Sequence, residues 1–286
     1  MMKALMLFRA VSCTTRAAGC SRDTARKTAS FLSPALAIAL PMLVFVQPAS
    51  AGVIAYGGSM TTNNGYIIHS YTNPATAWDQ WNTMLVSNLS VVQGGNAEVL
   101  VVAGGGGGGE AGGAGGAGGL IYSNPYALFA GITTNVTVGI AGAGRSGDRT
   151  CGFKGSDSTF GYLTAEGGGY GGGGWKYVST VLNGGPGGSG GGSVRADYAA
   201  GNPNAGPPVQ GNIGGRGTVS SAGGGGGGAG TAGIASSSGI GGDGGTGRYF
   251  AVFAAFGSPA GWFAGGGGGG TVTPGATRGT GGPGGA

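Results

Sequence analysis

The chain has 286 residues, of which 75 are glycine and only 8% are charged, so its composition departs strongly from that of an ordinary globular domain. Its formal net charge is +5, from 14 basic and 9 acidic residues, but six of the basic residues and one of the acidic residues lie within residues 1–51. The rest of the chain is therefore balanced at 8 basic and 8 acidic residues, which argues against a basic surface for nucleic acid.

Residues 1–51 have the pattern of an export signal. Basic residues precede an apolar stretch at 32–46, and a small-residue cleavage motif follows it: Ala49, Ser50 and Ala51. The apolar stretch is shorter than the roughly 20 residues that span a bilayer. We therefore predict cleavage after Ala51 rather than an uncleaved membrane anchor, and a secreted or cell-surface location in a bacterium.

Removal of this leader also changes the cysteine count. Cys13 and Cys20 leave with it, so Cys151 is alone and no disulfide within the processed chain is expected. Cys151 is then either a small buried apolar residue or an intermolecular link, and we favour the first.

The processed chain, 52–286, reads as one glycine-rich β domain that is strand-rich over 52–166 and rich in glycine tracts over 167–286. Apolar and β-branched runs predict strands at 53–56, 66–72, 85–92, 98–103, 120–122, 132–139 and on both sides of Gly161 within 157–165. Residues 76–83 indicate a short helical turn or a loop, and 93–96 a turn. Alternation predicts Val136 and Val138 on one face of their strand.

Glycine tracts follow the strands, first at 104–119 and then throughout 167–286. Collagen is excluded, because the glycine frame breaks at Glu110 and prolines are few. Two interpretations remain. The tracts form either a flexible low-complexity chain or a packed array of extended glycine helices.

Five motifs occur in a fixed order: IHSY at 68–71, AEVLVVAGGGGGG at 97–109, GGAGGLIY at 115–122, VTVGIAGAG at 136–144 and GSDSTFGYLTAEGGG at 155–169. This series resembles the glycine-rich domain family of bacterial secreted proteins and phage tail-fibre proteins. It is also similar in style to the glycine-rich part of the ectodomains of anaplastic lymphoma kinase and leukocyte tyrosine kinase.

The resemblance implies an all-β fold, a jelly-roll-like β-sandwich similar to tumour necrosis factor, with glycine tracts packed as polyglycine II helices. Such helices have three residues per turn and no internal hydrogen bonds, so each tract must bond laterally to its neighbours. Members of the family commonly end with a short apolar strand. This sequence ends in GTGGPGGA, which leaves three alternatives: the closing strand is missing, the gene is truncated, or residues 248–256 replace the strand.

The sequence offers little catalytic chemistry. The single histidine, His69, lies in a predicted strand without a recognisable triad. Gly187–Gly191 fits G-x-S-x-G only because the tract is rich in glycine, and it lacks the strand–turn–helix context of a nucleophile elbow. One histidine and one remaining cysteine exclude the usual zinc sets. We therefore expect no catalytic residue, no metal and no cofactor.

Aromatic residues that interrupt the glycine tracts are the better candidates for binding, because glycine offers little contact area. The candidate binding residues are Tyr170, Trp175, Tyr177, Tyr249, Phe250, Phe253, Trp262 and Phe263. The alternative is that these side chains cap the array and fill the core.

The sequence thus predicts an exported, non-enzymatic, structural or adhesive protein. Its partner would be a cell-surface polysaccharide or protein, without nucleic acid, with membrane contact only through an uncleaved leader, and with homo-oligomers left open. Two other classes remain as alternatives. They are a secreted hydrolase with an unrecognised site and an ice-binding protein.

Overall fold

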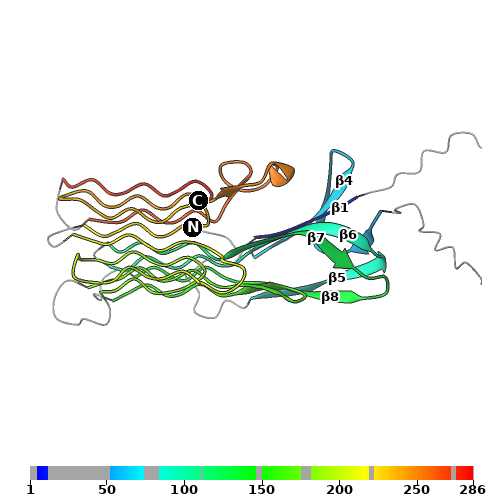
Figure 1. Ribbon diagram of the computed structural model, residues 1–286, viewed down its shortest axis with the longest axis horizontal. Coiled ribbons are helices and arrows are strands. Elements are labelled where there is room, and N and C mark those ends of the chain that lie inside the picture. Colours follow the sequence, from blue (N-terminus) through cyan, green and yellow to red (C-terminus); the bar gives the residue numbers. More distant parts are fainter. Residues whose placement is uncertain are drawn as a thin grey trace, which may run out of the picture.

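The computed structural model describes residues 52–73, 84–110, 112–145, 150–174, 182–218, 222–271 and 275–285, together with the backbone of 5–11. Figure 1 shows an elongated molecule with β-strands at one end and glycine tracts, running side by side along the long axis, at the other. The described residues contain one short 3-10 turn, η2 (Ala251–Phe253), and no helix long and apolar enough to cross a membrane.

Two five-stranded antiparallel sheets form the strand-rich end. The first sheet has the order β3 (Ser59–Asn63), β4 (Tyr66–Thr72), β1 (Leu5–Val11), β6 (Gly95–Val102) and β7 (Leu120–Leu128). The second has the order β10 (Leu163–Ala165), β9 (Ser158–Phe160), β8 (Thr133–Val138), β5 (Leu85–Gln93) and β2 (Ile54–Tyr56). A hydrophobic cluster with members from both sheets joins them, so the predicted all-β sandwich is confirmed.

Strand β6 explains the uninterrupted apolar run that the sequence shows there. Val99 and Val101 belong to the core between the sheets, whereas Leu100 and Val102 belong to a second cluster on the opposite face. Because both faces of the strand are covered, neither face favours polar residues and the run is continuously apolar. β6 therefore contributes to both clusters, as β4 and β7 also do.

Most predicted strands are confirmed, among them β4 with the same bounds and the pair β9 and β10 around Gly161. Val136 and Val138 are both fully buried, as the alternation predicts. The predicted turn at 93–96 is wrong in extent, because β6 begins at Gly95 and only Gly94 interrupts the strands. The predicted turn or loop at 76–83 lies outside the described residues.

Two strands of the first sheet were not predicted from the sequence. β3 is short and mostly polar, and its residues are largely exposed at the edge of the sheet, so no hydrophobic pattern marks it. β1 comes from the predicted leader and lies between β4 and β6 (Figure 1). Cleavage after Ala51 stays a prediction, and in the intact chain β1 pairs with both neighbouring strands.

The glycine tracts continue the strand pairing with a different period. β6 and β7 pair up to Val102 opposite Leu120. Beyond that pair, Ala103 donates to the carbonyl of Gly119, Gly106 to Gly116 and Gly109 to Gly113, at 3.0, 2.9 and 3.0 Å between N and O. The step between bonds is three residues, which is the repeat of the polyglycine II geometry.

One fully buried tract, residues 223–228, distributes its backbone N–H groups over three neighbouring segments. Gly223 and Gly226 donate to a segment at 264–270, Gly224 and Gly227 to 190–193, and Gly225 and Gly228 to 231–234. Each neighbour thus receives a bond from every third residue. In a strand the amides point to two sides only, whereas here they point to three.

The carbonyl groups of the same tract accept from three further segments. The donors lie at 242–245, at 114–117 and at Gly215. On the sides of these segments there is no space for a side chain, because a Cβ added at Gly225 would lie 1.9 Å from the Asp243 carbonyl oxygen and one at Gly226 2.0 Å from that of Gly115. Each tract residue must therefore be glycine so that six neighbours can approach.

Two adjacent glycines of one tract offer a matched test of this packing. A Cβ at Gly107 would lie 2.0 Å from the Ala143 carbonyl oxygen, whereas a Cβ at Gly108 would meet only the Gly113 oxygen at 3.5 Å. We expect Gly107→Ala to lower the free energy of unfolding by about 1–3 kcal/mol or more through overpacking, and Gly108→Ala to change it by less than about 1 kcal/mol.

Denaturant unfolding of the two variants measures the difference. Equal effects of the two substitutions would contradict a close-packed array and favour flexible glycine tracts.

Candidate functional site

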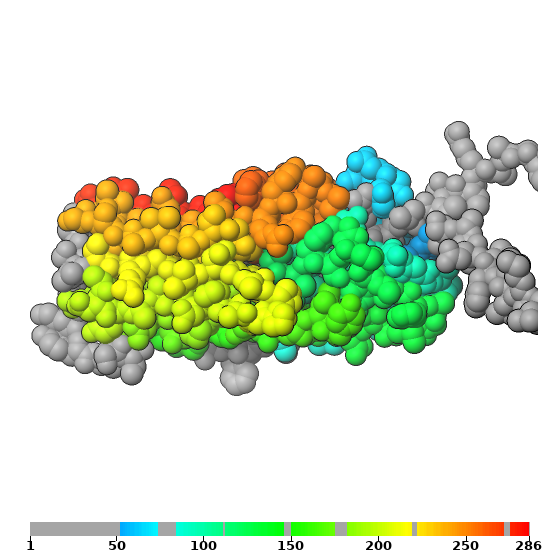
Figure 2. Space-filling view, viewed as in Figure 1, coloured from blue at the N-terminus to red at the C-terminus, as the bar shows by residue number. Residues whose placement is uncertain are grey.

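The last aromatic residues form a separate hairpin rather than a strand of either sheet. β11 (Arg248–Tyr249) pairs antiparallel with β12 (Trp262–Phe263), with Tyr249 opposite Trp262. Residues 248–256 therefore do not close the sandwich. In Figure 2 the orange segment that carries this hairpin forms a raised part of the surface where the glycine tracts meet the strands.

The base of the hairpin is buried in the second hydrophobic cluster. Phe253 is fully buried and Phe250 and Phe263 are nearly so. They pack in one cluster with Ile68 and Leu100, which face away from the core between the sheets. Because this loop covers the outer face of the first sheet, these three phenylalanines act as core and a ligand does not reach them.

Two predicted binding residues remain at the surface of the hairpin. Tyr249 is 53% exposed and Trp262 is half-buried, with ring centroids 5.7 Å apart and planes tilted by 50°. Gly261 has a φ of +79°, and a Cβ there would lie 2.6 Å from Cε2 of Tyr249. Glycine at this position therefore lets the ring of Tyr249 lie against the backbone. We call Tyr249 and Trp262 the aromatic pair.

The other predicted binding residues lie elsewhere. Tyr170 is half-buried, and its ring lies so close to the backbone of Gly185 that a Cβ there would be 2.4 Å from it. Tyr170 thus packs against the glycine array. Trp175 and Tyr177 lie outside the described residues, so their part in binding stays a prediction.

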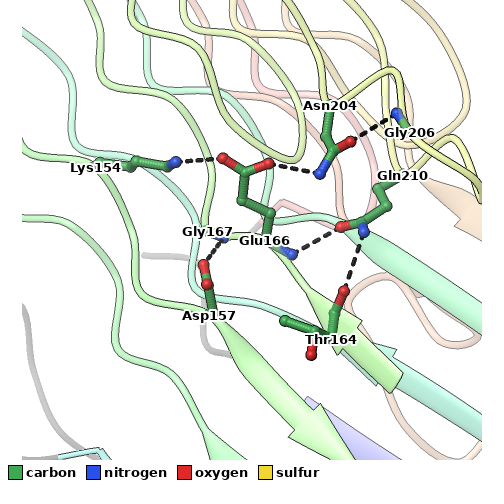
Figure 3. A network of polar contacts seen from close by, with 8 residues as sticks. All are labelled: Lys154, Asp157, Thr164, Glu166, Gly167, Asn204, Gly206 and Gln210. Atoms are coloured by element: carbon green, nitrogen blue, oxygen red, sulfur yellow. Dashed lines mark hydrogen bonds and ion pairs between the residues drawn. The ribbon is translucent and has the colours of Figure 1, made fainter. Parts of the chain in front are cut away.

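A polar network that the sequence did not predict joins β10 to the glycine tracts (Figure 3). The Glu166 carboxylate pairs with Lys154 and accepts a hydrogen bond from Asn204 Nδ2 at 2.7 Å. The backbone N–H of Glu166 donates to Gln210 Oε1 at 2.7 Å, and Gln210 Nε2 donates to the carbonyl of Thr164 at 3.0 Å.

The network holds the end of β10 against one segment, through Asn204 and Gln210, which lie 38 and 44 residues after Glu166 in the chain. β10 is an edge strand, so its outer side has no neighbouring strand to bond its backbone groups. The buried side-chain amide of Gln210 bonds the backbone there in place of such a strand. No local sequence pattern marks these residues, because their partners are distant. Their polar atoms are used in bonds within the chain, and we assign the network a structural role.

The serine of the discounted G-x-S-x-G match lies in an enclosed position, whereas Asp243 is exposed. Ser189 is fully buried within the tracts, and a Cβ at Gly211 would lie 2.0 Å from its Oγ. The Asp243 carboxylate accepts from the N–H and the hydroxyl of Thr280, at 2.7 and 2.9 Å, and these bonds lower the pKa of Asp243. Within the described ranges no three His, Cys, Asp or Glu side chains come together as a metal site. Cys151 is half-buried.

Exposed apolar residues also occur on the outer face of the second sheet. Tyr56 on β2 and Val86 and Val92 on β5 are 58%, 74% and 60% exposed. The alternation along 85–92 is the signal that could have located this face, but only the sheet order brings β2 beside β5. Tyr162 is 76% exposed as well, with its ring stacked on that of Tyr126 at 5.0 Å.

His69 is buried, and its Nδ1 lies 2.7 Å from the carbonyl oxygen of Gly57. Burial lowers the pKa of His69 below its usual value of 6.5, against the smaller, raising effect of this hydrogen bond. The unfolded chain therefore binds a proton at a higher pH than the folded chain does. Stability is full above about pH 6.5 and is lost as the pH falls toward the folded pKa.

Because the sequence has one histidine, a change of folding stability with pH just below pH 6.5 can be assigned to His69. We expect the thermal midpoint of the unsubstituted chain to fall from pH 7 to pH 5.5, and that of His69→Gln to vary less over the same range. A parallel fall in both proteins would show that another group titrates.

The burial of the hairpin gives a second expected result. Phe253→Ala removes a fully buried ring, and we expect a loss of about 3–5 kcal/mol in the free energy of unfolding. Tyr249→Ala at the exposed position should change it by less than about 1 kcal/mol. Chemical denaturation of both variants measures this contrast, and a stable Phe253→Ala protein would contradict the packing of the hairpin on β4 and β6.

Comparison with known protein families gives a match over most of the chain. A family model described as a glycine-rich domain matches residues 83–286. No curated protein and no solved structure matches the chain significantly. The matched range includes the second half of the sandwich, every glycine tract and the aromatic hairpin.

Proposed function

Because the chain belongs to the glycine-rich domain family, we propose that it is an exported, non-enzymatic protein that uses a rigid glycine array to present aromatic side chains to a surface partner. The observation that carries this proposal is the position of the aromatic pair. Tyr249 is exposed and Trp262 is half-buried on a hairpin in which Phe250, Phe253 and Phe263 are buried.

The hairpin is held in a way that suits recognition. Its base packs on β4 and β6, and Ala229 donates to the carbonyl of Ala264, directly after β12, at 2.8 Å. The aromatic pair loses little conformational entropy on binding, because the backbone of the anchored hairpin is already fixed. Aromatic side chains of this kind dominate recognition surfaces in general.

The expected partner is a polysaccharide or protein of the cell surface. The leader at 1–51 supports export, and the balance of 8 basic and 8 acidic residues beyond it supports contact through rings rather than through charge. A location outside the cell, on its surface or secreted, is part of the same proposal. An ordered array of glycine helices extends by about 3.1 Å per residue, so it can hold the binding side chains at a fixed distance. Both a structural and an adhesive role are consistent with such a spacer.

Binding of the purified protein to cell envelopes and to isolated envelope polysaccharides tests this proposal. We expect the double substitution Tyr249→Ala, Trp262→Ala to weaken binding by roughly thirtyfold, as loss of an aromatic anchor pair does, with an unchanged thermal midpoint. Raising the salt concentration should have little effect.

Tyr162→Ala serves as the matched control, because this tyrosine is more exposed than Tyr249 and lies on the turn between β9 and β10. Equal loss of binding in the control and the double variant would contradict the assignment of the aromatic pair. Binding that disappears with salt and survives the double substitution would place the contact elsewhere.

A further inference from the structure

The predicted leader contributes the central strand of the first sheet. β1 is antiparallel to both of its neighbours, from Leu5 opposite Thr72 to Val11 opposite Tyr66 on β4, and from Leu5 opposite Val102 to Ala10 opposite Ala97 on β6. A central strand uses its backbone donors and acceptors on both sides. Removal of residues 1–51 would therefore leave β4 and β6 each without a partner on the side that β1 occupies, in the middle of a sheet.

The two strands cannot close this gap by moving together. Each is antiparallel to β1, so β4 and β6 run parallel to one another, two strand spacings or about 9.5 Å apart. β4 is held in place independently of β1: it pairs with β3, Tyr71 Oη donates to the carbonyl of Asn88 at 3.0 Å, and Asn73 Nδ2, next to β4, donates to that of Val138 at 3.2 Å.

β6 is fixed as firmly on its own side. It pairs with β7, and Val99, Leu100 and Val101 are fully buried between the two hydrophobic clusters. Direct pairing of β4 with β6 would have to break the bonds of Tyr71 and Asn73 or open one cluster. We call the gap between β4 and β6 the acceptor slot.

The surroundings of the acceptor slot define what fits it. On one face lies the core between the sheets and on the other the cluster that contains Phe250, Phe253 and Phe263, so an occupant must be apolar on both faces. The register places position 9 of β1 opposite Glu98. Glu98 is half-buried and accepts a hydrogen bond from Tyr122 Oη at 2.8 Å, which favours a basic residue at that position.

The segment that occupies the slot has this chemistry. Its sequence, LMLFRAV, contains six apolar residues and one arginine, and the arginine is at position 9. An export signal by itself requires basic and apolar residues but no particular strand register.

We propose that the acceptor slot is a peptide-binding site for an extended, apolar segment of about seven residues with one basic residue opposite Glu98. Leu5–Val11 fills the slot in the intact chain, and its removal after Ala51 opens the slot to a segment of the same chemistry from another polypeptide. Main-chain hydrogen bonds to both strands hold the segment, and side-chain positions on two faces select it. This binding site is separate from the aromatic pair and does not depend on the proposed function.

The experiment starts from the full chain with a protease recognition sequence inserted between Ala51 and Gly52. The protein is folded intact and then cut, so that residues 1–51 become a separate fragment. A fluorescent peptide with the sequence of Leu5–Val11 and a solubilising tail is added in excess, and binding is followed by anisotropy and size-exclusion chromatography. We expect one peptide per cut chain, with release of the fragment, and no binding to the uncut chain.

Two altered peptides test the mode of binding. Phe8→Pro removes a backbone donor in a strand that is bonded on both sides, and we expect no measurable binding. Arg9→Glu places two like charges opposite one another, and we expect about tenfold weaker binding. In a Glu98→Gln protein the difference between the original peptide and the Arg9→Glu peptide should nearly disappear, which a purely structural role of Glu98 would not produce.

Three outcomes would overturn the proposal. They are equal binding to the cut and uncut chains, binding of the Phe8→Pro peptide as strong as that of the original, and a cut chain that releases its fragment without taking up any peptide. If the cut chain associates with itself, dissociation of the oligomers by the peptide supports the acceptor slot, and oligomers that persist in excess peptide assign the slot to a second copy instead.

Discussion

Lateral hydrogen bonding between glycine backbones is the interaction on which the structure depends. Each residue of the tract 223–228 donates its N–H to one neighbouring segment and accepts at its carbonyl from another. Successive residues bond to different segments. Ordering one residue costs about 1–2 kcal/mol and a net hydrogen bond returns about 0.5–1.5 kcal/mol. A single tract is therefore not stable alone, and the tracts are ordered only as a group.

The sandwich supplies what the tracts lack, which is a fixed starting point. The first two runs of glycine tract away from the sandwich begin and end on strands. β6 leads into 103–109 and 113–119 leads back into β7, and β8 and β9 enclose 139–157 in the same way. Because the paired strands already hold both ends of such a run at neighbouring positions, formation of the sheet has already offset part of the loop-closure entropy. The network around Glu166 and Gln210 adds a second attachment at β10.

This division of the molecule has a consequence for function. Residues within the tracts have no side chains with which to recognise a partner, and those of the core are enclosed. The two binding sites that we propose lie where side chains or free strand edges remain: the hairpin of β11 and β12, and the acceptor slot between β4 and β6. They would use different chemistry, aromatic contact in the hairpin and strand pairing in the slot.

The sequence by itself determined the period-two strands and the all-β class, since β4, β8 and the pair β9 and β10 follow from local alternation and turn residues. It also identified the aromatic residues that interrupt the tracts. It could not separate Phe253, which is buried, from Tyr249, which is exposed, because both lie in the same apolar stretch and only packing on Ile68 and Leu100 distinguishes them.

Only the tertiary structure decided which glycine tracts lie side by side, because the glycine runs are alike in sequence. The hydrogen bonds that join neighbouring tracts can link residues more than a hundred positions apart, as between Ala114 and Gly224. The same holds for β1, whose segment reads as part of a leader and whose partners are defined by register alone. Local patterns specify which residues can form a strand or a glycine helix. Long-range backbone bonding specifies which of them meet.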